Sequence, residues 1–412
     1  MRIPHLSRNV ALFLLASALI DVGVFGIMDV LLNFFYRSID FNLEAISVLQ
    51  GAQRIGGLLF SLPAGLLIAR LGARRTLIIA AVIIALALVG MTIGSDFGWQ
   101  YGVRALLGAG YSTVYIAMIP MVATLVGREQ YTTVFSYQFI AVALAVAITN
   151  SIGGSLPGAL ASLFPTLGGA ESTGAYAGSL WVAAVFPLLC LIPLALLPDT
   201  KAPVTTPAQA RIGVPWGNIL IISLPMFIFG LSAGMSLPYY NLFFRDTFAL
   251  SDAMIGNIFT LGAVAMLAIT LIVPYTARRV GQVSALALAM FATGAAFLLL
   301  SLTPGIELTV VFYMLALGLR NTMTPLYSPL LLDRVDERHH GLISSVSTGA
   351  WSLGFLVITF FSGGWVQQFG YPFLFQLTAL TTLVTGALAL VIFRALRPVV
   401  QEVKVVVQPG GV

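Results

Sequence analysis

Charged side chains are scarce in this 412-residue sequence, in which Asp, Glu, Lys and Arg together make up 8%. A soluble domain usually carries about 25% charged residues, and a chain with so few could not solvate the surface of a water-soluble fold. Cysteine is nearly absent too, and the single Cys190 can form no internal disulfide. Because Cys190 lies within an apolar run, we expect it to have a packing role.

The motifs of nucleotide, metal and nucleophilic chemistry are also missing. The sequence has no nucleotide-binding motif, no cluster of metal ligands and no pairing of a nucleophile with a base. Its polar segments are too short to fold an ATPase domain. We therefore expect a protein that is not an enzyme, with no cofactor and no metal.

Long apolar runs are abundant, since the chain is 59% hydrophobic with a mean hydropathy of +0.99. A helix needs about 18 to 20 residues to cross ~30 Å of hydrocarbon, whereas a membrane β-barrel would show short alternating segments. The continuous runs therefore predict an all-α integral membrane protein. Its twelve expected transmembrane helices lie at residues 10–36, 44–69, 76–95, 98–127, 133–157, 175–197, 217–245, 252–277, 282–303, 307–333, 341–366 and 371–394.

The basic residues are distributed unevenly between the two ends of these helices. Cytoplasmic loops carry an excess of Lys and Arg, which sets the orientation of a membrane protein. If both termini are cytoplasmic, the outer loops hold only Arg37 and Arg245. The cytoplasmic side then holds most of the 20 Lys and Arg, namely Arg2, Arg8, Arg70, Arg74, Arg75, Arg128, Lys201, Arg211, Arg278, Arg279, Arg334, Arg338, Arg394, Arg397 and Lys404. We therefore expect a multi-pass protein of a bacterial-type inner membrane with both termini in the cytoplasm, and the net charge of +5 requires no nucleic-acid partner.

The chain divides into two halves at its longest internal polar segment, residues 198–216. This segment follows six apolar runs, and its prolines favour an extended cytoplasmic linker. The division predicts an N-terminal six-helix bundle over residues 1–197 and a C-terminal six-helix bundle over residues 217–394. Residues 395–412 are expected to form a cytoplasmic tail.

The two halves repeat each other at an offset of 208 to 209 residues. The matched pairs include Asn33 with Asn241, Arg37 with Arg245, Gly72 with Gly281, and Gly154 with Gly363. Two six-helix bundles related by a pseudo-two-fold axis along the membrane normal are a known plan of transporters, with the substrate near the midplane between them.

The loop between the second and third expected helices, residues 65–75, reads GLLIARLGARR. It resembles the signature of the major facilitator superfamily, and RALLGAG at residues 104–110 resembles a second motif of that family. The family usually has an aspartate in place of Ala69, so the cytoplasmic latch that this acid forms must be weaker or built differently here. The resemblance implies a cytoplasmic gating motif made of Gly65, Arg70, Gly72, Arg74 and Arg75.

Each residue type in this motif has a physical role that does not depend on the resemblance. We expect Gly65 to permit close helix approach and Gly72 to permit a tight turn. The arginines can bond helix C-terminal carbonyls and anionic lipid. The alternative is that these charges only set the orientation.

Ionisable residues are rare within the expected helices, where a charge is costly and usually marks a functional site. Those well inside the apolar runs are Asp21, Asp29, Arg54, Arg104 and Arg320. The resemblance implies that the first, fourth, seventh and tenth helices line a central cavity. All of these residues except Arg54 fall on the first, fourth and tenth helices.

Asp21, Asp29 and Arg104 are the candidates for proton coupling. A carboxyl at membrane depth can bind and release a proton when a cavity changes sides. At 1.5 Å per residue, Asp29 lies at a depth where it can meet Arg104 or Arg54. The alternative is a fixed ion pair that only holds the N-terminal bundle together. Two acids on the first helix with an arginine on the fourth resemble the arrangement in multidrug:proton antiporters.

Arg320 is the first candidate for contacting a polar or anionic part of a substrate. No acid in the C-terminal half obviously neutralises it, and two prolines interrupt the helix that follows. The alternative is that Arg320 bonds backbone carbonyls. The other candidate substrate-binding residues are Arg54, Asn33, Asn241, Tyr115, Tyr240, Tyr327 and Trp351.

These features together predict a monomeric secondary transporter that works by alternating access, with a small molecule, protons and membrane lipids as its partners. The first interpretation is proton-coupled export of amphipathic or drug-like compounds. The alternatives are an importer of a sugar, organic acid or other anion, and a lipid flippase or non-transporting sensor. A cavity lined by Met, Phe and Tyr would favour amphipathic cargo, whereas a cluster of Asn, Gln and Arg would favour a sugar or an anion.

Overall fold

The computed structural model describes residues 7–199, 216–336 and 339–396. Every element in these ranges is a helix, and no strand occurs in them, so the expected all-α fold is confirmed for this part of the chain. Most of the expected linker and tail lies outside the described residues, as do Arg2, Lys201, Arg211, Arg338, Arg397 and Lys404.

The N-terminal half begins with a span built from three helical segments in succession, of which the middle one is a π-helix. Its elements are α1 (Arg8–Asp21), η1 (Val22–Met28), α2 (Asp29–Ser38), α3 (Leu43–Leu71), α4 (Ala73–Gly90), α5 (Phe97–Leu125), η2 (Arg128–Gln130), α6 (Tyr131–Leu163), η3 (Pro165–Leu167), α7 (Thr173–Leu189) and α8 (Leu191–Ala195).

The C-terminal half likewise begins with an interrupted span, here broken by a short 3-10 helix. Its elements are α9 (Trp216–Ser236), η4 (Leu237–Tyr239), α10 (Tyr240–Phe248), α11 (Asp252–Val280), α12 (Gln282–Leu302), α13 (Ile306–Asn321), α14 (Met323–Leu332) and α15 (His340–Ala395).

Eleven helices in the described part of the chain are long and apolar enough to cross a membrane. One of them, α15, has 56 residues and would be about 84 Å long if straight, far more than ~30 Å of hydrocarbon. Gly370, at φ 79° and ψ 172°, breaks the helical backbone inside α15. Two spans meet there, so the structure agrees with the twelve predicted crossings.

Capping side chains explain where several spans begin. Asn42, Asp96, Ser172 and Ser251 precede α3, α5, α7 and α11, and each accepts a hydrogen bond from a backbone N–H of the first turn. These caps satisfy N–H groups that have no partner within the helix. All four caps lie at the same end of the molecule, which we call the distal end.

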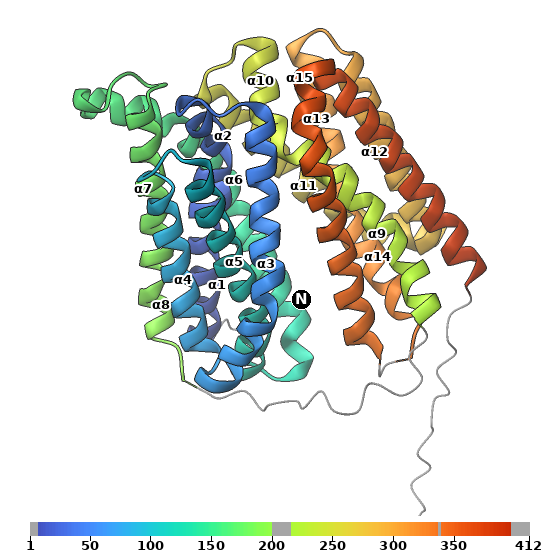
Figure 1. Ribbon diagram of the computed structural model, residues 1–412. Coiled ribbons are helices and arrows are strands. Elements are labelled where there is room, and N and C mark those ends of the chain that lie inside the picture. Colours follow the sequence, from blue (N-terminus) through green and yellow to red (C-terminus); the bar gives the residue numbers. More distant parts are fainter. Residues whose placement is uncertain (1–6, 200–215, 337–338, 397–412) are drawn as a thin grey trace, which may run out of the picture.

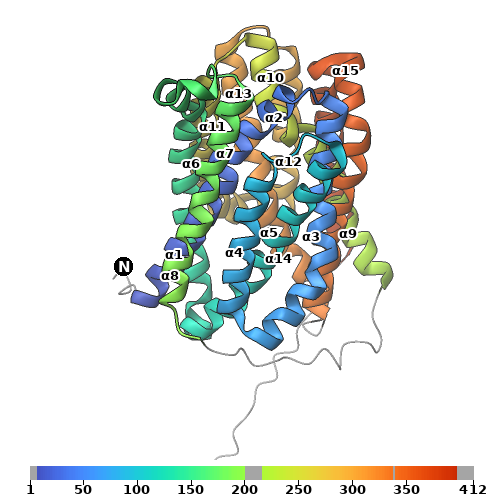
Figure 2. The same ribbon diagram turned by 60° about the vertical axis from the view of Figure 1, so that its left-hand side comes forward.

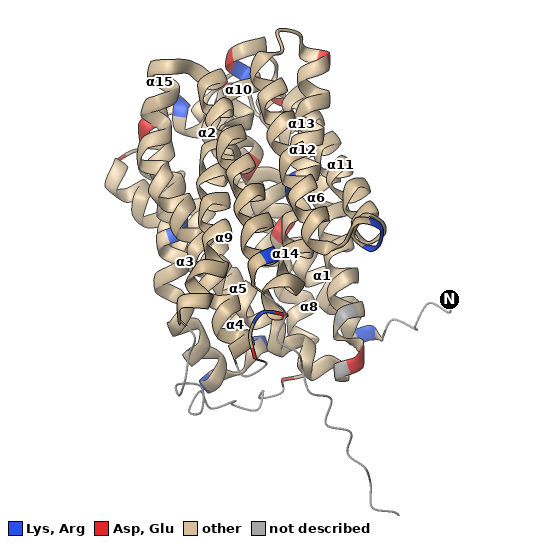
Figure 3. Ribbon diagram, turned by 90° about the vertical axis from the view of Figure 1, so that its right-hand side faces the viewer, with Lys and Arg blue, Asp and Glu red and all other residues tan. Residues whose placement is uncertain are grey.

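The opposite end, at which α1 begins and α15 ends, is called the terminal end below. The elements α1–α8 gather in one bundle and α9–α15 in the other, and the two bundles converge distally and diverge toward the terminal end (Figures 1 and 2). Between the bundles, α3 packs against α15 and α6 packs against α11. Figure 3 shows charged residues mostly near the two ends, with few in between.

The contacts between the bundles depend on glycines. A Cβ atom on Gly154 of α6 would lie 2.3 Å from the carbonyl oxygen of Asp252 at the start of α11. A Cβ atom on Gly363 of α15 would lie 2.4 Å from the carbonyl oxygen of Leu43 at the start of α3. Only glycine allows such close approach of two helices. The two contacts differ by 209 residues on both sides, the offset of the sequence repeat.

Candidate functional site

A cavity of about 710 Å³ lies between the two bundles, on the terminal side of their distal contacts. Its wall comes from α3 and α5 of one bundle and from α9, α13, α14 and α15 of the other. The wall contains aromatic and leucine side chains together with the hydroxyl groups of serine, threonine and tyrosine. The wall includes the two arginines Arg54 and Arg320 and, among the described residues, no Asp or Glu. The cavity is therefore amphipathic and positively charged.

Arg54 reaches from α3 across to the C-terminal bundle. Its guanidinium carbon lies 4.8 Å from the ring centre of Trp351 and 4.5 Å from that of Phe355, both on α15. A guanidinium over an aromatic face is stabilised by the electron density of the ring. Arg54 therefore joins the bundles as well as lining the cavity.

Arg320 lies where α13 gives way to α14, near the middle of the span. Its side chain is 5% exposed, and one terminal nitrogen donates to the hydroxyl of Ser236 at 2.6 Å. The guanidinium carbon lies 5.0 Å from the ring centre of Phe229. The second terminal nitrogen has no hydrogen-bond partner. The predicted substrate residue thus lines the cavity with part of its donor capacity unused.

Asp21 lies at the end of α1, directly before the π-helix η1. It is 7% exposed, and its carboxylate accepts a hydrogen bond from the hydroxyl of Tyr111 at 2.9 Å. Tyr111 itself lines the cavity. One side chain therefore separates this buried carboxyl group from the cavity, and π-helical turns often occur at such functional positions.

Asp29 does not form the direct ion pair with Arg104 or Arg54 that its depth suggests, as none joins these groups within the described chain. Its side chain is accessible to solvent although it lies deep in the bundle, and it interacts electrostatically with both arginines. Arg104 is 1% exposed and instead donates to Gln50 at 2.6 Å and to the sulfur of Met28 at 3.4 Å. A neutral amide therefore holds Arg104 in place.

Asn33 and Asn241 bond to each other across the two bundles and do not line the cavity. The amide of Asn33 donates to the side-chain oxygen of Asn241 at 2.9 Å and to the carbonyl of Pro238 at 2.6 Å. Asn241 donates in turn to the carbonyl of Val30 at 3.0 Å. Their predicted role in substrate binding is not supported in this conformation, because their polar groups are buried in this contact. The side-chain amide of Gln50 links Asn33 to Arg104, since it donates to Asn33 at 3.1 Å.

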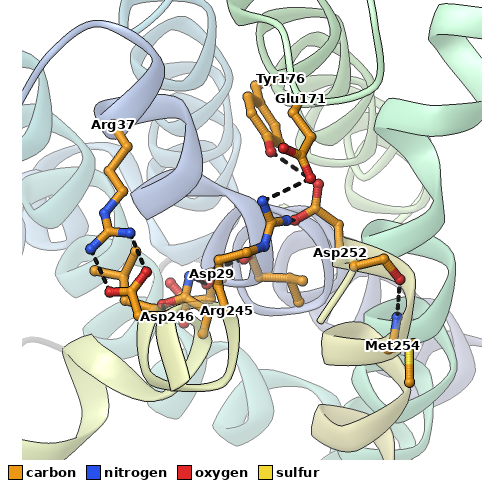
Figure 4. A network of polar contacts seen from close by, with 12 residues as sticks. Asp29, Arg37, Glu171, Tyr176, Arg245, Asp246, Asp252 and Met254 are labelled. Carbon is orange, nitrogen blue, oxygen red and sulfur yellow. Dashed lines mark hydrogen bonds and ion pairs between the residues drawn. The ribbon is translucent and has the colours of Figure 1, made fainter. Parts of the chain in front are cut away.

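Ion pairs close the distal end beyond these asparagines (Figure 4). Arg37 forms a two-pronged pair with Asp246 of the other bundle, and the hydroxyl of Tyr371 donates to Asp246 at 2.6 Å. The guanidinium of Arg245 binds Asp252 and also reaches Glu171 of the N-terminal bundle at 3.0 Å.

The acids of this distal closure were not predicted as functional. The sequence repeat could have indicated this closure, because it matched Arg37 with Arg245, the two arginines that bind these acids.

The predicted aromatic residues divide into two groups. Tyr115, Tyr327 and Trp351 line the cavity, and Tyr115 is 68% exposed. Tyr240 is 3% exposed and packs against Tyr313, with ring centres 5.0 Å apart, behind the cavity wall. Sequence reasoning could not make this distinction, because it depends on how each helix is rotated.

The predicted gating loop adopts only part of the expected geometry. Gly72 has φ 84° and forms the turn between α3 and α4, as expected. The expected close helix approach at Gly65 is wrong for this conformation, because the bundles are apart there and an added Cβ would meet nothing within 4 Å. Arg75 pairs with Asp199 at 2.8 Å, and Arg70 is exposed. Helix C-terminal carbonyls are instead bound by Arg334, which donates to those of Phe393 and Leu396.

Solved structures of several transporters share this fold. A bacterial homologue of the human lysosomal transporter Spinster, inward-facing and unoccupied, has a TM-score of 0.75 and 11% identity and covers 96% of this chain and 98% of its own. The nucleoside transporter NupG has a TM-score of 0.67 and 13% identity, covering 94% and 99%. A bacterial homologue of the iron transporter ferroportin, inward-facing, has a TM-score of 0.66 and 16% identity, covering 94% and 98%. No curated protein sequence matches the chain.

These distant structural similarities show only the fold. The family of the chain is shown by a match to a family model. The model of the Major Facilitator Superfamily matches residues 13–225 and 222–408, which together span nearly the whole chain. Its members are membrane transporters of small molecules and not enzymes. The chain therefore belongs to the major facilitator superfamily and is a multi-pass membrane transporter.

Proposed function

We propose that this protein is a proton-coupled secondary transporter that exports amphipathic small molecules by alternating access. The observation that carries the proposal is the amphipathic cavity between the bundles, below a distal end that Asn33, Asn241 and ion pairs close. A site held between two bundles can face either side when the bundles rock against each other.

The rocking movement is supported by the repeated contacts between the bundles. The glycine contacts of Gly154 and Gly363 recur at an offset of 209 residues, as a pseudo-two-fold axis between residues 1–197 and 217–394 would require. The excess of basic residues at the terminal end supports a cytoplasmic position for both termini. The conformation is then inward-facing, like that of the Spinster and ferroportin homologues.

The carboxyl groups of Asp21 and Asp29 support coupling to protons. Asp21 touches the cavity wall through Tyr111, and Asp29 has no fixed ion pair among the described residues. Asp21 can therefore respond to the cavity, and Asp29 is not locked to an arginine that would hold it in one charge state. We propose that one of these carboxyl groups binds a proton when the cavity faces one side of the membrane and releases that proton when the cavity faces the other side.

The composition of the wall supports an amphipathic substrate over a sugar. A sugar site needs many amide and charged groups, and the only amides in the described wall are those of Gln53 and Asn321. Aromatic rings and hydroxyls make up much of the remainder. The direction of transport, export, rests on the resemblance of the charge pattern to multidrug:proton antiporters. We propose a monomer in a bacterial-type inner membrane, surrounded by lipid.

Proteoliposomes that enclose the pH-sensitive dye pyranine test this proposal. Three probes of similar size are added outside: naphthalene-2-sulfonate, 2-naphthylmethanol and the quaternary cation 2-naphthylmethyl-trimethylammonium. At least one should drive proton movement beyond that in protein-free liposomes. If none does, proton-coupled transport of amphipathic compounds is wrong. If a probe crosses without moving protons, coupling alone is wrong.

A further inference from the structure

We infer that the cavity selects amphipathic organic anions, with Arg320 as the anchor for a carboxylate or sulfonate head group. This inference rests on the proposed function, since it names the substrate class of the same cavity. It separates the substrates expected here from organic cations.

The first observation is that the charge of Arg320 is uncompensated. The residue is 5% exposed, and no Asp or Glu of the described chain pairs with it. Its contacts include the hydroxyls of Ser236 and Tyr240 and the ring of Phe229, all neutral, and one terminal nitrogen has no partner at hydrogen-bond geometry. A buried guanidinium with an unused donor is costly, so a partner that binds there gains strongly.

The second observation is that the hydroxyl groups beside Arg320 are neutral and already engaged. Tyr240 lies beside Arg320, and its buried hydroxyl interacts with the guanidinium and with the hydroxyl of Ser236. The neighbouring hydroxyl of Ser236 is already engaged, because it donates to the carbonyl of Ser232 at 2.9 Å. The unpaired terminal nitrogen of Arg320 therefore remains as a charged donor for an oxygen of a carboxylate or sulfonate.

The third observation is the charge balance of the wall. No acid is found among the described wall residues, and Asp21 lies behind Tyr111. The other arginine of the wall, Arg54, lies over two aromatic rings, so it adds positive potential but is less free to bind a head group. An organic cation would meet two positive charges and no negative partner.

The apolar part of such a ligand also finds a matching surface. The aromatic side chains of Tyr111, Tyr115 and Trp351 line the same cavity, and Tyr115 is 68% exposed. A volume of about 710 Å³ accommodates a compound of drug-like size. A compound with one anionic end and an aromatic body therefore fits the wall best.

Equilibrium dialysis of the full chain in lipid nanodiscs, against the same three naphthalene probes, tests the inference, with protein-free nanodiscs as the blank. We expect naphthalene-2-sulfonate to bind at least about tenfold more tightly than 2-naphthylmethanol, and the quaternary cation to bind most weakly. Equal affinity for the three probes, or tighter binding of the cation, would overturn the inference.

Substitutions test whether the preference for the sulfonate probe depends on Arg320. Arg320→Gln should reduce the preference for sulfonate over alcohol to about twofold or less while alcohol binding stays nearly constant, and Tyr240→Phe should reduce the preference by a smaller factor. The matched control is Arg278→Gln, since Arg278 lies outside the cavity wall and bonds a carbonyl of its own helix. If Arg320→Gln and Tyr240→Phe both keep the full preference, the head group binds elsewhere and the inference is wrong. Should Arg320→Gln not fold, the probe series on the unmodified chain and Tyr240→Phe still decide.

These experiments test the anion site and the proposed proton-coupled transport separately. Preference for the sulfonate without proton movement would retain the anion site and remove the proposed coupling. Proton movement driven by the cation, together with tighter binding of that cation, would retain the transporter and remove the anion site.

Discussion

The three arginines inside the membrane show how one residue type takes three roles. Arg54 stacks on two rings of the opposite bundle, Arg104 bonds to a glutamine, and Arg320 keeps an unpaired donor. A guanidinium has five donors in a fixed plane, so its environment decides whether it serves structure or binding. Arg320 lines the cavity with an unpaired terminal nitrogen, and it is the one that we assign to the ligand.

Asp21 allows a test of coupling at the residue scale. Asp21→Asn keeps the side-chain volume and mimics the protonated carboxyl group, so the variant should bind its preferred naphthalene probe within about threefold of the unmodified protein, or ~0.7 kcal/mol. Probe-driven proton movement should fall to the level of protein-free liposomes, because no proton is exchanged at this position.

Tyr111→Phe is the matched control for the hydrogen bond to Asp21, since it removes the hydroxyl and leaves the carboxyl group. It should change the rate of proton movement but not abolish it. Full proton movement in a well-folded Asp21→Asn protein would remove Asp21 from the coupling role and leave Asp29 as the candidate.

At the scale of elements, the interrupted helices coincide with the polar residues. The π-helix η1 separates Asp21 from Asp29, η4 follows Ser236, and α13 ends one residue after Arg320. Irregular backbone at membrane depth is tolerated where it is covered by protein or lines a cavity. The breaks therefore carry the groups that we assign to coupling and binding.

The crossing of α3 and α15 gives a test at this scale. Gly363→Val would place side-chain atoms against the carbonyl of Leu43, whereas the neighbouring Gly364 has nothing within 4 Å and provides the matched control, Gly364→Val. Overpacking costs about 1–3 kcal/mol. Gly363→Val should therefore destabilise the closed distal end and shift the equilibrium between its closed and open states toward the open state by about tenfold.

Reaction of a cysteine placed at Ser112 in the cavity wall reports this opening. An impermeant thiol reagent added at the distal side should label Ser112→Cys faster when Gly363→Val is present, and no faster with Gly364→Val. The native Cys190 is buried and gives little background. Identical labelling rates in the two valine variants would contradict a distal closure that depends on this crossing.

At the scale of the whole molecule, the two bundles meet distally and separate terminally. Polar contacts across the distal end join Arg37 to Asp246 and Asn33 to Asn241. Exposed ion pairs contribute only about 0–1 kcal/mol each. The distal closure is therefore held by several weak contacts and by close helix packing, which suits a state that must open in each transport cycle.

The orientation of the whole molecule is tested with two exposed positions at opposite ends. Ala69→Cys lies at the terminal end of α3, and Gly305→Cys lies just before α13 at the distal end. In intact cells an impermeant thiol reagent should label Gly305→Cys and should spare Ala69→Cys until the cells are permeabilised. The opposite labelling pattern would reverse the proposed orientation and would make the conformation outward-facing.

The sequence by itself determined the twelve crossings and the repeat. The length and hydropathy of a segment are local properties, and they suffice to predict that the segment spans the hydrocarbon core of a bilayer. It also identified the buried Asp21, Arg104 and Arg320, since any ionisable residue inside an apolar run stands out. The turn at Gly72 followed from its residue type, and the observed φ of 84° agrees.

Only the tertiary structure decided the partner of each charge and which predicted residues line the cavity. Arg104 bonds Gln50 and not Asp29, Asn33 bonds Asn241, and Tyr240 lies behind the wall. These contacts join residues on different helices, and they depend on helix rotation and on the relative position of the two bundles. The open surroundings of Gly65 depend on that position as well, because a transporter that changes its conformation has more than one set of contacts for a single sequence.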